Sequence, residues 1–262
     1  MKTLVVKLGG HALDHLEVGA PVLADLASDV AALRVEGTSV VVVHGGGPQI
    51  GALLSSLAMP SSFVEGLRVT DDATMEVVAT ALSFVNLRIV ATLNTAGLKS
   101  VGLSGADAGM LYATALGDPW GRAATKPVVD PTLVRDLLHL GYTPVLSSVG
   151  LDEDGGLLNC NADTMAGAMA AALGTELVLL SDVDQVRANP DDESSVIESL
   201  TRSEANAMLE NGTAREGMRP KLTAALDALD GGASRVRLAN GRRAHALAQL
   251  LSGVLASTEV TA

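Results

Sequence analysis

A chain of 262 residues is long enough for one large α/β domain or for two lobes that share a sheet. A net charge of -12 argues against a nucleic-acid or anionic-membrane partner, and a single cysteine excludes a disulfide framework. Only 2% of the residues are aromatic, so the core must be built from Ala, Val and Leu. The apolar run 3–8 is too short for a signal peptide or a membrane span. We therefore expect a soluble, cytoplasmic protein.

Strands and helices alternate through the first half of the chain. In order, apolar runs and helical spacing predict a strand over 3–6, a helix over 21–33, a strand over 40–43, a helix beginning at Pro48, a helix over 70–96 and a strand over 101–103. Thr70 is expected to cap the helix 70–96, with Asp71 and Asp72 at the positive end of its dipole. The long apolar stripe of that helix could pack against the sheet or against a second subunit.

The second half continues the alternation after a mixed stretch, 108–130, that predicts small antiparallel strands. The further elements are a helix over 130–140, a strand over 144–149, a helix over 161–173, a strand over 176–180, a polar loop over 188–195, helices over 201–211 and 217–229, a strand over 236–239 and a helix over 243–251. This pattern predicts an α/β fold with a largely parallel, open central sheet sandwiched between helices.

A strand, a glycine turn and a helix start follow one another in the segment 39–50, SVVVVHGGGPQI. Four consecutive valines predict a strand that is buried on both faces. Gly45–Gly47 carry no side chains, and Pro48 suits the first turn of a helix. The arrangement presents backbone N–H groups to an anion, although a tight turn without a ligand would need a single glycine.

Polar or glycine-rich turns follow four of the predicted strands. They are Lys7-Leu8-Gly9-Gly10, Gly45–Gly47, Ser104-Gly105 and Ser181-Asp182. Because the carboxyl ends of parallel strands lie at one edge of the sheet, where such folds bind ligands, these turns are expected to lie together. Four such turns at one edge predict a ligand site there.

Several other kinds of site are excluded by missing signatures. The Walker pattern GxxxxGK[ST] and the GxGxxG fingerprint are absent, and the HGGG segment lacks the GxSxG elbow of an esterase. No HExxH or clustered His and Cys spacing indicates zinc. What remains is the glycine turns with Lys7, Lys221, Asn159 and Asp163. Phosphoryl transfer fits these residues, because it needs positioning and positive charge more than covalent help.

Seven segments resemble, in this order and spacing, the acetylglutamate kinases of the amino-acid kinase family over essentially the whole chain. They are KLGG (7–10), VVHGGGP (42–48), GLRVT (66–70), GLSG (102–105), LNCNAD (158–163), LLSDV (179–183) and GMRPK (217–221). Aspartate, glutamate, carbamate and uridylate kinases share the KxGG strand exit. The GLRVT and Asn-x-Asn-Ala-Asp segments carry the resemblance to acetylglutamate kinases and to their acetylaminoadipate relatives.

The resemblance implies ATP-dependent phosphorylation of the γ-carboxylate of N-acetyl-L-glutamate, a step of arginine biosynthesis. It also implies two lobes that share the sheet, with the amino-acid substrate and the dimer contact in residues 1–173 and ATP in residues 174–262. Mg²⁺ would arrive with the ATP phosphates, without a metal site in the protein. An N-blocked α-aminoadipate, one methylene longer and belonging to lysine biosynthesis, is the alternative substrate. A non-catalytic regulatory member of the fold is a third reading.

The same resemblance implies catalytic roles for five residues. Lys7 and Lys221 would stabilise the transferring phosphoryl group from two sides, and Asp163, held between the two cations, would orient them. Gly10 and Gly46 would donate backbone N–H groups to the phosphoryl oxygens. These intact residues argue against the non-catalytic reading.

Substrate binding is implied for Gly45, Gly46, Arg68 and Asn159. Arg68 would grip the α-carboxylate with a bidentate fork, and Asn159 would hold the amide end. Taken singly, an arginine of this kind is more often a surface ion pair and an asparagine a turn residue. Their joint placement at motif positions favours the functional reading.

Nucleotide binding is implied for a larger set, which begins in the Lys7 turn and continues in the C-terminal lobe. The set is Lys7, Gly9, Ser181, Asp182, Val183, Gln185, Arg187, Thr213, Arg215 and Lys221. Gln185 departs from the family, which has a glycine there. Cys160 and His44 are expected to be structural, the thiol packed inward and the imidazole orienting its loop by a hydrogen bond.

Assembly and regulation are also expected from the resemblance. The helix 70–96 is the expected homodimer contact. Arginine-inhibited members carry an extra helix before KxGG, whereas six residues precede Lys7 here. We therefore expect a homodimer that arginine does not inhibit.

Overall fold

The computed structural model describes residues 2–9, 13, 20–182, 185–189, 191–192, 194–215 and 218–261. Gly10, Val183 and Gly217, which the sequence places in or beside the site, lie outside these ranges.

An eight-stranded sheet forms the middle layer, in the order β16-β18-β17-β13-β1-β2-β10-β5. Its strands are β1 (Lys2–Leu8), β2 (Thr38–His44), β5 (Ser100–Ser104), β10 (Thr143–Ser147), β13 (Glu176–Ser181), β16 (Ser199–Thr201), β17 (Arg235–Asn240) and β18 (Ser257–Thr261). Neighbours from β17 to β5 are parallel, and β18 runs antiparallel to β17. The predicted largely parallel sheet is confirmed, and β16 and β18 are additional strands at one edge.

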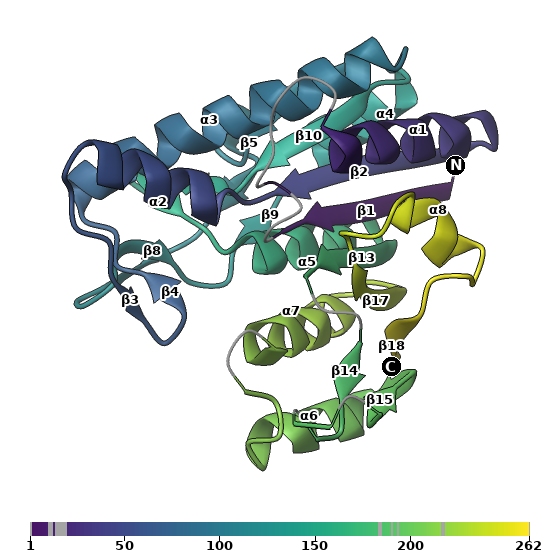
Figure 1. Ribbon diagram of the computed structural model, residues 1–262. Helices are drawn as coiled ribbons and strands as arrows, with labels where there is room; N and C mark the ends of the chain where they lie inside the picture. Colours follow the sequence, from purple (N-terminus) through teal and green to yellow (C-terminus); the bar gives the residue numbers. More distant parts are fainter. Residues whose placement is uncertain are drawn as a thin grey trace.

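Helices cover both faces of this sheet (Figure 1). The helices are α1 (Pro21–Val35), α2 (Gly47–Ser56), α3 (Asp72–Thr95), α4 (Thr132–His139), α5 (Ala162–Leu173), α6 (Arg202–Glu210), α7 (Met218–Asp230) and α8 (Ala246–Leu251). Side chains alternate along each strand, so Leu4 and Val6 pack with α1, α3 and α8, whereas Val5 packs in the cluster of α4, α5, α6 and α7. Because both faces of β1 and β2 are buried, the middle of each strand is an unbroken apolar run, at 4–6 in β1 and 40–43 in β2.

A second, mixed sheet has the order β7-β8-β12-β11-β6-β9, and its strand β8 lies at the left of Figure 1, the end towards which β1 and β2 point. Its strands are β6 (Leu111–Tyr112), β7 (Ala115–Gly117), β8 (Gly121–Ala124), β9 (Val128–Val129), β11 (Val149–Leu151) and β12 (Leu157–Asn159), with the 3₁₀ turn η2 (Asp107–Gly109) before β6. The small strands predicted between 108 and 130 are therefore confirmed, in a sheet that also includes two later strands.

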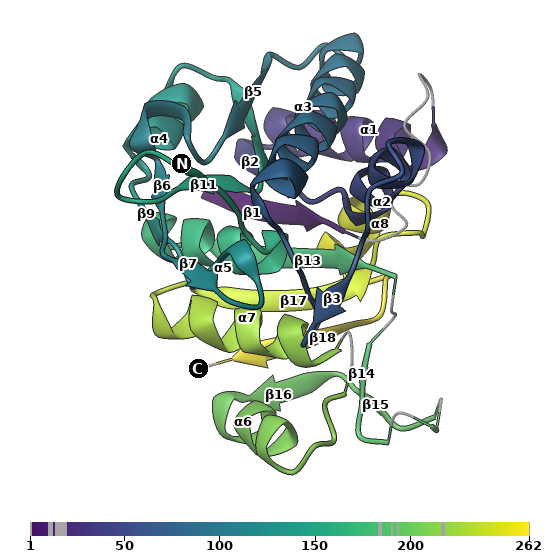
Figure 2. The same ribbon diagram turned by 90° about the vertical axis from the view of Figure 1, so that its left-hand side faces the viewer.

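The hairpin of β3 (Phe63–Val64) and β4 (Leu67–Arg68) lies at the same end and faces the viewer in Figure 2. The indole of Trp120, the single tryptophan of the chain, donates from Nε1 to Val64 O at 3.1 Å. The backbone of the same residue accepts from Thr70 N at 3.1 Å. The turn between β7 and β8 thus ties down both the hairpin and the chain that leaves it.

The start of α3 differs from the prediction. Asp71, rather than Thr70, caps the helix, because its carboxylate accepts from Thr74 N at 2.7 Å. Its hydrogen bonds with Thr74 lower the pKa of Asp71 below its ordinary value. The hydroxyl of Thr70 instead donates to Arg68 O at 2.9 Å. The predicted cap residue therefore serves the preceding hairpin.

The apolar stripe of α3 is buried within the protomer. Met75, Val78 and Leu82 pack with α2, and Val85 and Ile89 pack on the sheet. By length and composition α3 could also cross a membrane, a test that core helices of soluble proteins pass as well. Its packing in the core accounts for the stripe, so a second subunit could contact only the opposite face of the helix.

The C-terminal elements also differ in their bounds. The hairpin strands β14 (Val186–Arg187) and β15 (Val196–Ile197) flank the predicted polar loop, and α8 begins at Ala246 instead of 243. His245 directly precedes α8 in a left-handed conformation, with a φ of 48°.

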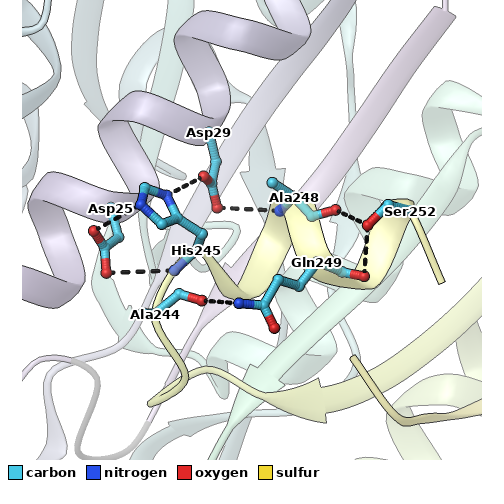
Figure 3. Close-up of polar contacts among 7 residues, drawn as sticks. All are labelled: Asp25, Asp29, Ala244, His245, Ala248, Gln249 and Ser252. Carbon is cyan, nitrogen blue, oxygen red and sulfur yellow. Dashed lines mark hydrogen bonds and ion pairs between the residues drawn. The ribbon is translucent and has the colours of Figure 1, made fainter. Parts of the chain in front are cut away.

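Two carboxylates of α1 hold the start of α8 (Figure 3). Asp29, which is 3% exposed, accepts from Ala248 N at 3.1 Å, and its Oδ1 lies 2.8 Å from His245 Nδ1. Asp25 accepts from His245 N at 3.3 Å. The hydrogen bond with Asp29, together with the charges of Asp25 and Asp29, raises the pKa of His245. Charged side chains thus hold α1 against α8, on the face of the sheet that α1, α3 and α8 cover.

Candidate active site

The turns predicted to share one edge of the sheet do so. The register pairs Leu8 with both His44 and Leu180, so the turns after β1, β2 and β13 lie side by side. Ser147 pairs with Ser104 in the same way, which adds the ends of β10 and β5. The carboxyl edge therefore gathers the polar strand ends into one row, as such folds do for ligands.

A buried ion pair lies at the centre of this row. Lys7 Nζ is 2.7 Å from Asp163 Oδ1, with 9% and 10% of the two side chains exposed. Asn161 caps α5 and accepts from Asp163 N at 2.9 Å, which fixes the first turn that carries the carboxylate. A Cβ at Gly9 would overlap Lys7 Nζ, so the glycine leaves room for the ammonium group. The structure brings together three residues that the resemblance placed in the site.

The middle residue of the glycine turn, Gly46, has no room for a side chain. A Cβ at Gly46 would lie 2.9 Å from Leu82 Cδ2 on α3, whereas the φ of 180° at this residue is open to any amino acid. Gly46 is the N-cap of α2, and no side chain caps that helix. Pro48 is its second residue instead of its first. The turn therefore places backbone N–H groups and the N-terminus of α2 at the carboxyl edge of the sheet, where the Lys7–Asp163 ion pair lies.

His44 shapes this turn, as predicted. Its Nδ1 lies 2.8 Å from Gly45 O, and burial lowers its pKa to about 4. The imidazole is therefore neutral at physiological pH and supplies no positive charge to a ligand. Its Nε2 lies 3.0 Å from Nδ2 of Asn86, a residue that sequence reasoning missed because it adjoins the apolar stripe of α3.

A cavity of about 170 Å³ opens between the glycine turn, the β3–β4 hairpin and the start of α5. Gly45, Gly46, Arg68 and Asn159, the four predicted substrate-binding residues, all line it. Further lining comes from apolar side chains, including Ile50, and from the polar residues Ser148 and Asn161. Its walls thus combine backbone amides, one cation and apolar surface, which suits a small polar ligand with an apolar group.

Arg68 is a buried cation, 8% exposed. Its guanidinium donates to Ser61 Oγ at 2.5 Å and to Gly47 O at 3.2 Å, and it stacks 4.6 Å from the Phe63 ring centroid. Burial lowers the pKa of Arg68, and within the described ranges no carboxylate lies at ion-pair distance from it. A buried charge of this kind is stabilised by an anionic partner, so the cavity favours a carboxylate ligand.

Behind Asn159, which lines the cavity, lies a row of hydrogen bonds. Asn159 Nδ2 donates to Thr70 Oγ1 at 3.0 Å, and that hydroxyl donates in turn to Arg68 O. Next to it, Cys160 is buried, and this burial raises the pKa of its thiol to about 12. The prediction that Cys160 packs inward is confirmed, and such a thiol is no nucleophile at neutral pH.

A second hollow, of about 340 Å³, adjoins the first through the shared lining residues Leu67 and Asn161. It is bounded by the first turns of α5 and α7. These two helices run parallel, since a Cβ at Gly167 would touch Ala228 Cβ at 3.2 Å and one at Gly231 would meet Ala171 Cβ at 2.8 Å. Lys221, in the first turn of α7 and half-buried, is thus at the same end of the helix pair as Asp163.

The predicted nucleotide residues divide into two groups. Ser181 ends β13 beside the Lys7 turn and accepts from Gly241 N at 2.7 Å, and exposed Asp182 follows it. Gln185 and Arg187 lie farther along at β14, and Thr213 and Arg215 lie between α6 and α7. None of these last four lines either hollow.

Gln185 has a structural contact of its own. Its Nε2 donates to Ser257 O at 3.1 Å, which ties the loop to β18. Among the described residues, no three His, Cys, Asp or Glu side chains converge to hold a metal ion.

The family model for the amino acid kinase family matches residues 2–240. The chain is 40% identical to an acetylglutamate kinase of Parvibaculum lavamentivorans over 94% of this chain and 84% of that one. It is 43% identical to one from a Synechococcus strain over the same shares, and 40% identical to the chloroplastic enzyme of Arabidopsis thaliana over 99% and 75%.

Solved structures agree with the fold. A protein from Streptococcus mutans UA159 superposes with a TM-score of 0.82 at 27% identity, covering 99% of this chain and 98% of that one. An N-acetylglutamate synthase from Neisseria gonorrhoeae shares the fold at a TM-score of 0.81 and 24% identity, over 100% of this chain and 59% of that one. With a family model that spans nearly all of it and relatives that carry one enzyme name, the chain belongs to the amino acid kinase family, among the acetylglutamate kinases.

Proposed function

We propose that the protein phosphorylates the γ-carboxylate of N-acetyl-L-glutamate with ATP, in arginine biosynthesis. The product is an acyl phosphate, N-acetylglutamyl 5-phosphate. The names of the relatives support this substrate over the longer aminoadipate. A biosynthetic role of this kind fits the cytoplasm, as the sequence led us to expect.

The observation that carries the proposal is buried Arg68 in the wall of the 170 Å³ cavity. A guanidinium fork matches a carboxylate in two parallel hydrogen bonds. In the proposed complex Arg68 binds the α-carboxylate and Asn159 holds the amide end. The apolar part of the wall, with Ile50 and Leu82, suits the acetyl methyl group.

The transfer itself needs charge and alignment. An oxygen of the γ-carboxylate attacks the γ-phosphorus of ATP, the bond from that phosphorus to the β,γ-bridging oxygen breaks, and ADP leaves. The attacking carboxylate is ionised, so no base is needed. Lys7 and Lys221 draw charge from the equatorial oxygens, Asp163 holds Lys7 in place, and the Gly10 and Gly46 N–H groups bind the same oxygens.

ATP and Mg²⁺ are assigned to the C-terminal part of the same edge, with residues 1–173 and 174–262 as the two lobes. Ser181 and Asp182, at the end of β13, are the nearest of the proposed nucleotide residues to the Lys7 turn. Lys7 and Lys221 suit phosphate oxygens, and Mg²⁺ would be held chiefly by those oxygens and by water. When bound, the ion neutralises phosphate charge.

An ATP-dependent hydroxamate assay tests the function, because hydroxylamine traps acyl phosphates. N-acetylglutamate should give product at least ten times faster than N-acetylaminoadipate at equal concentration. Lys221→Ala should lower kcat about 10²-fold or more, while Lys2→Ala, at an exposed position of β1, should not. Product from neither substrate would remove the proposal, and full activity of Lys221→Ala would remove that residue's role.

We also propose that the outward face of α3 forms a homodimer contact. Phe84 and Leu87 on this face are 51% and 66% exposed, and Arg88 stacks over Phe84 at 5.1 Å. Light scattering should give a dimer for the wild type and a monomer for Leu87→Glu. A larger assembly, or a dimer that survives this change, would contradict the assignment.

A further inference from the structure

A buried amide on α3 connects three strands of the sheet. Asn86 is 7% exposed, and its Nδ2 lies 2.9 Å from Val145 O, 3.3 Å from Leu103 O and 3.0 Å from His44 Nε2. These partners belong to β10, β5 and β2, which are neighbours in the sheet. One side-chain NH₂ group thus joins three strands near the carboxyl edge that carries the site.

Backbone carbonyl groups set the direction of this hydrogen-bond chain. A carbonyl oxygen only accepts, so the amide must turn its NH₂ group towards Val145 and Leu103. The same NH₂ group lies 3.0 Å from His44 Nε2, where a proton on Nε2 would set two donors against each other. Nε2 therefore accepts and carries no proton, and the two N–H groups of the amide are shared among three acceptors. The imidazole proton is then on Nδ1 and is donated to Gly45 O, 2.8 Å away. A chain of donors runs from Asn86 through His44 into the glycine turn.

Glycine at position 102 makes room for the amide. A Cβ there would overlap Asn86 Oδ1 and would lie 3.1 Å from a methyl carbon of Val90. Gly102 opens the GLSG segment, and the proposed chemistry gives it no role. The packing supplies a reason for it: the residue must lack a side chain for Asn86 to reach His44.

We propose that Asn86 is a positioning residue for phosphoryl transfer, which acts through His44 on the orientation of the Gly45–Gly47 turn. The inference rests on the proposed function, since that turn is where the transferring group is bound. Burial, opposed only by the hydrogen bond to Gly45, keeps the imidazole neutral. The turn is therefore held by neutral groups that do not compete with Lys7 for the anionic ligand.

Three substitutions break this chain in different ways. Asn86→Leu keeps the side-chain volume and removes both N–H donors of the amide. Gly102→Ala adds a methyl group that displaces the Asn86 amide from the side of its Oδ1. Asn86→Asp keeps the shape and presents an acceptor to Nε2. Asn94→Leu is the matched control, because this amide lies exposed on the same helix and accepts from Ser100 N at 2.7 Å, outside the chain.

Kinetics with N-acetylglutamate and ATP separate positioning from folding. In folded protein, quantified by circular dichroism, kcat of Asn86→Leu and Gly102→Ala should fall about 10- to 100-fold, because a small displacement of a binding group has effects of this size. The KM for N-acetylglutamate should change less than kcat, since Arg68 and Asn159, two of the four proposed substrate-binding residues, are outside the chain. Asn94→Leu should retain the wild-type kcat.

Histidine titration supplies a readout that does not need activity. In ¹⁵N-histidine spectra of the wild type, one neutral residue should lack a proton on Nε2 and should not titrate above about pH 5. In Asn86→Asp the carboxylate should favour a second proton on His44, so kcat of this variant should rise as the pH falls through the new pKa. Asn86→Leu should show no such rise.

The outcomes are distinguishable. A wild type without acyl phosphate product would overturn the proposed function, while the spectra would still test the hydrogen-bond chain. Wild-type kcat in folded Asn86→Leu would overturn the positioning role. A wild-type His44 protonated on Nε2 would overturn the direction of the chain.

Discussion

Two buried ion pairs lie at opposite edges of the same sheet. Lys7 and Asp163 meet at the carboxyl edge, with side chains 9% and 10% exposed. Arg237 and Glu176 meet near the amino ends of β17 and β13, with side chains 11% and 15% exposed. Equal burial therefore says little about role, whereas position along a parallel strand says much.

The partners of the two pairs explain the difference. Arg237 also donates from Nη1 to Leu250 O at 3.1 Å, and its Nε donates to Glu176 at 2.5 Å, so the guanidinium is occupied by the protein itself. Lys7 instead lies over Gly9, at the turn that faces the site. One pair completes the packing of α8 on the sheet, and the other holds a cation where a ligand can reach it.

Two isosteric substitutions, one in each ion pair, test most directly whether the two pairs differ in role. Asp163→Asn should lower kcat about 10²- to 10³-fold, because it removes the group that holds Lys7 in place. Glu176→Gln should leave kcat within about twofold and lower stability by about 3–5 kcal/mol, because it strips a buried guanidinium of its counter-ion. Kinetics and urea unfolding of both variants measure the two effects. Equal losses of kcat would show that the edges do not differ in role.

A second comparison concerns two arginines that stack on phenylalanines. Arg68→Lys should raise the KM for N-acetylglutamate about 10- to 100-fold, because an ammonium group cannot replace the bidentate fork. Arg88→Lys, its counterpart on the exposed face of α3, should leave KM unchanged. A wild-type KM for the Arg68 variant in steady-state assays would show that Arg68 does not bind the substrate.

The hairpin that carries Arg68 gives a smaller effect. Trp120→Phe keeps an aromatic ring, although a smaller one, but loses the hydrogen bond to Val64 O, so KM for N-acetylglutamate should rise about 2- to 10-fold. Tyr112→Phe, on the exposed side of β6, is the control. If both variants bind substrate as the wild type does, the indole does not hold the hairpin in its binding position.

The smallest effect lies at the α1–α8 joint, where the charged groups contribute to stability alone. The pKa of His245 is raised in the folded protein, so its contribution is complete below the unfolded pKa of about 6.5 and is lost as pH rises through the folded value. The Tm of the wild type should therefore fall more from pH 6 to pH 9 than that of His245→Gln. His139→Gln, an exposed histidine of α4, should follow the wild type, and parallel curves for all three proteins would exclude the effect.

Much of the fold could be predicted because each element carries a local signal. The valine run of β2 and the apolar stripe of α3 depend on burial that repeats along the chain. The short edge strands could not be read in the same way: β18 is held by its register with β17, and β14 pairs with β15 across a polar loop. Such strands depend on partners distant in sequence.

The residues of the candidate site also differ in how far the sequence could predict them. Lys7, Asp163 and Arg68 stand in recognisable segments, and the structure brings them to one edge. Asn86 follows Val85 in an apolar stripe, so nothing local distinguishes it from a residue at the border of the core. Its contacts come from three strands, which only the folded chain assembles.

The buried thiol of Cys160 has a practical consequence. With a pKa raised to about 12 and only 4% of its surface exposed, the single cysteine of the chain will resist maleimide at neutral pH. A cysteine introduced on the β3–β4 hairpin or on α8 can therefore take a fluorophore or spin label selectively, without a cysteine-free background. Distances between such labels would report in solution how the hairpin moves when substrate binds.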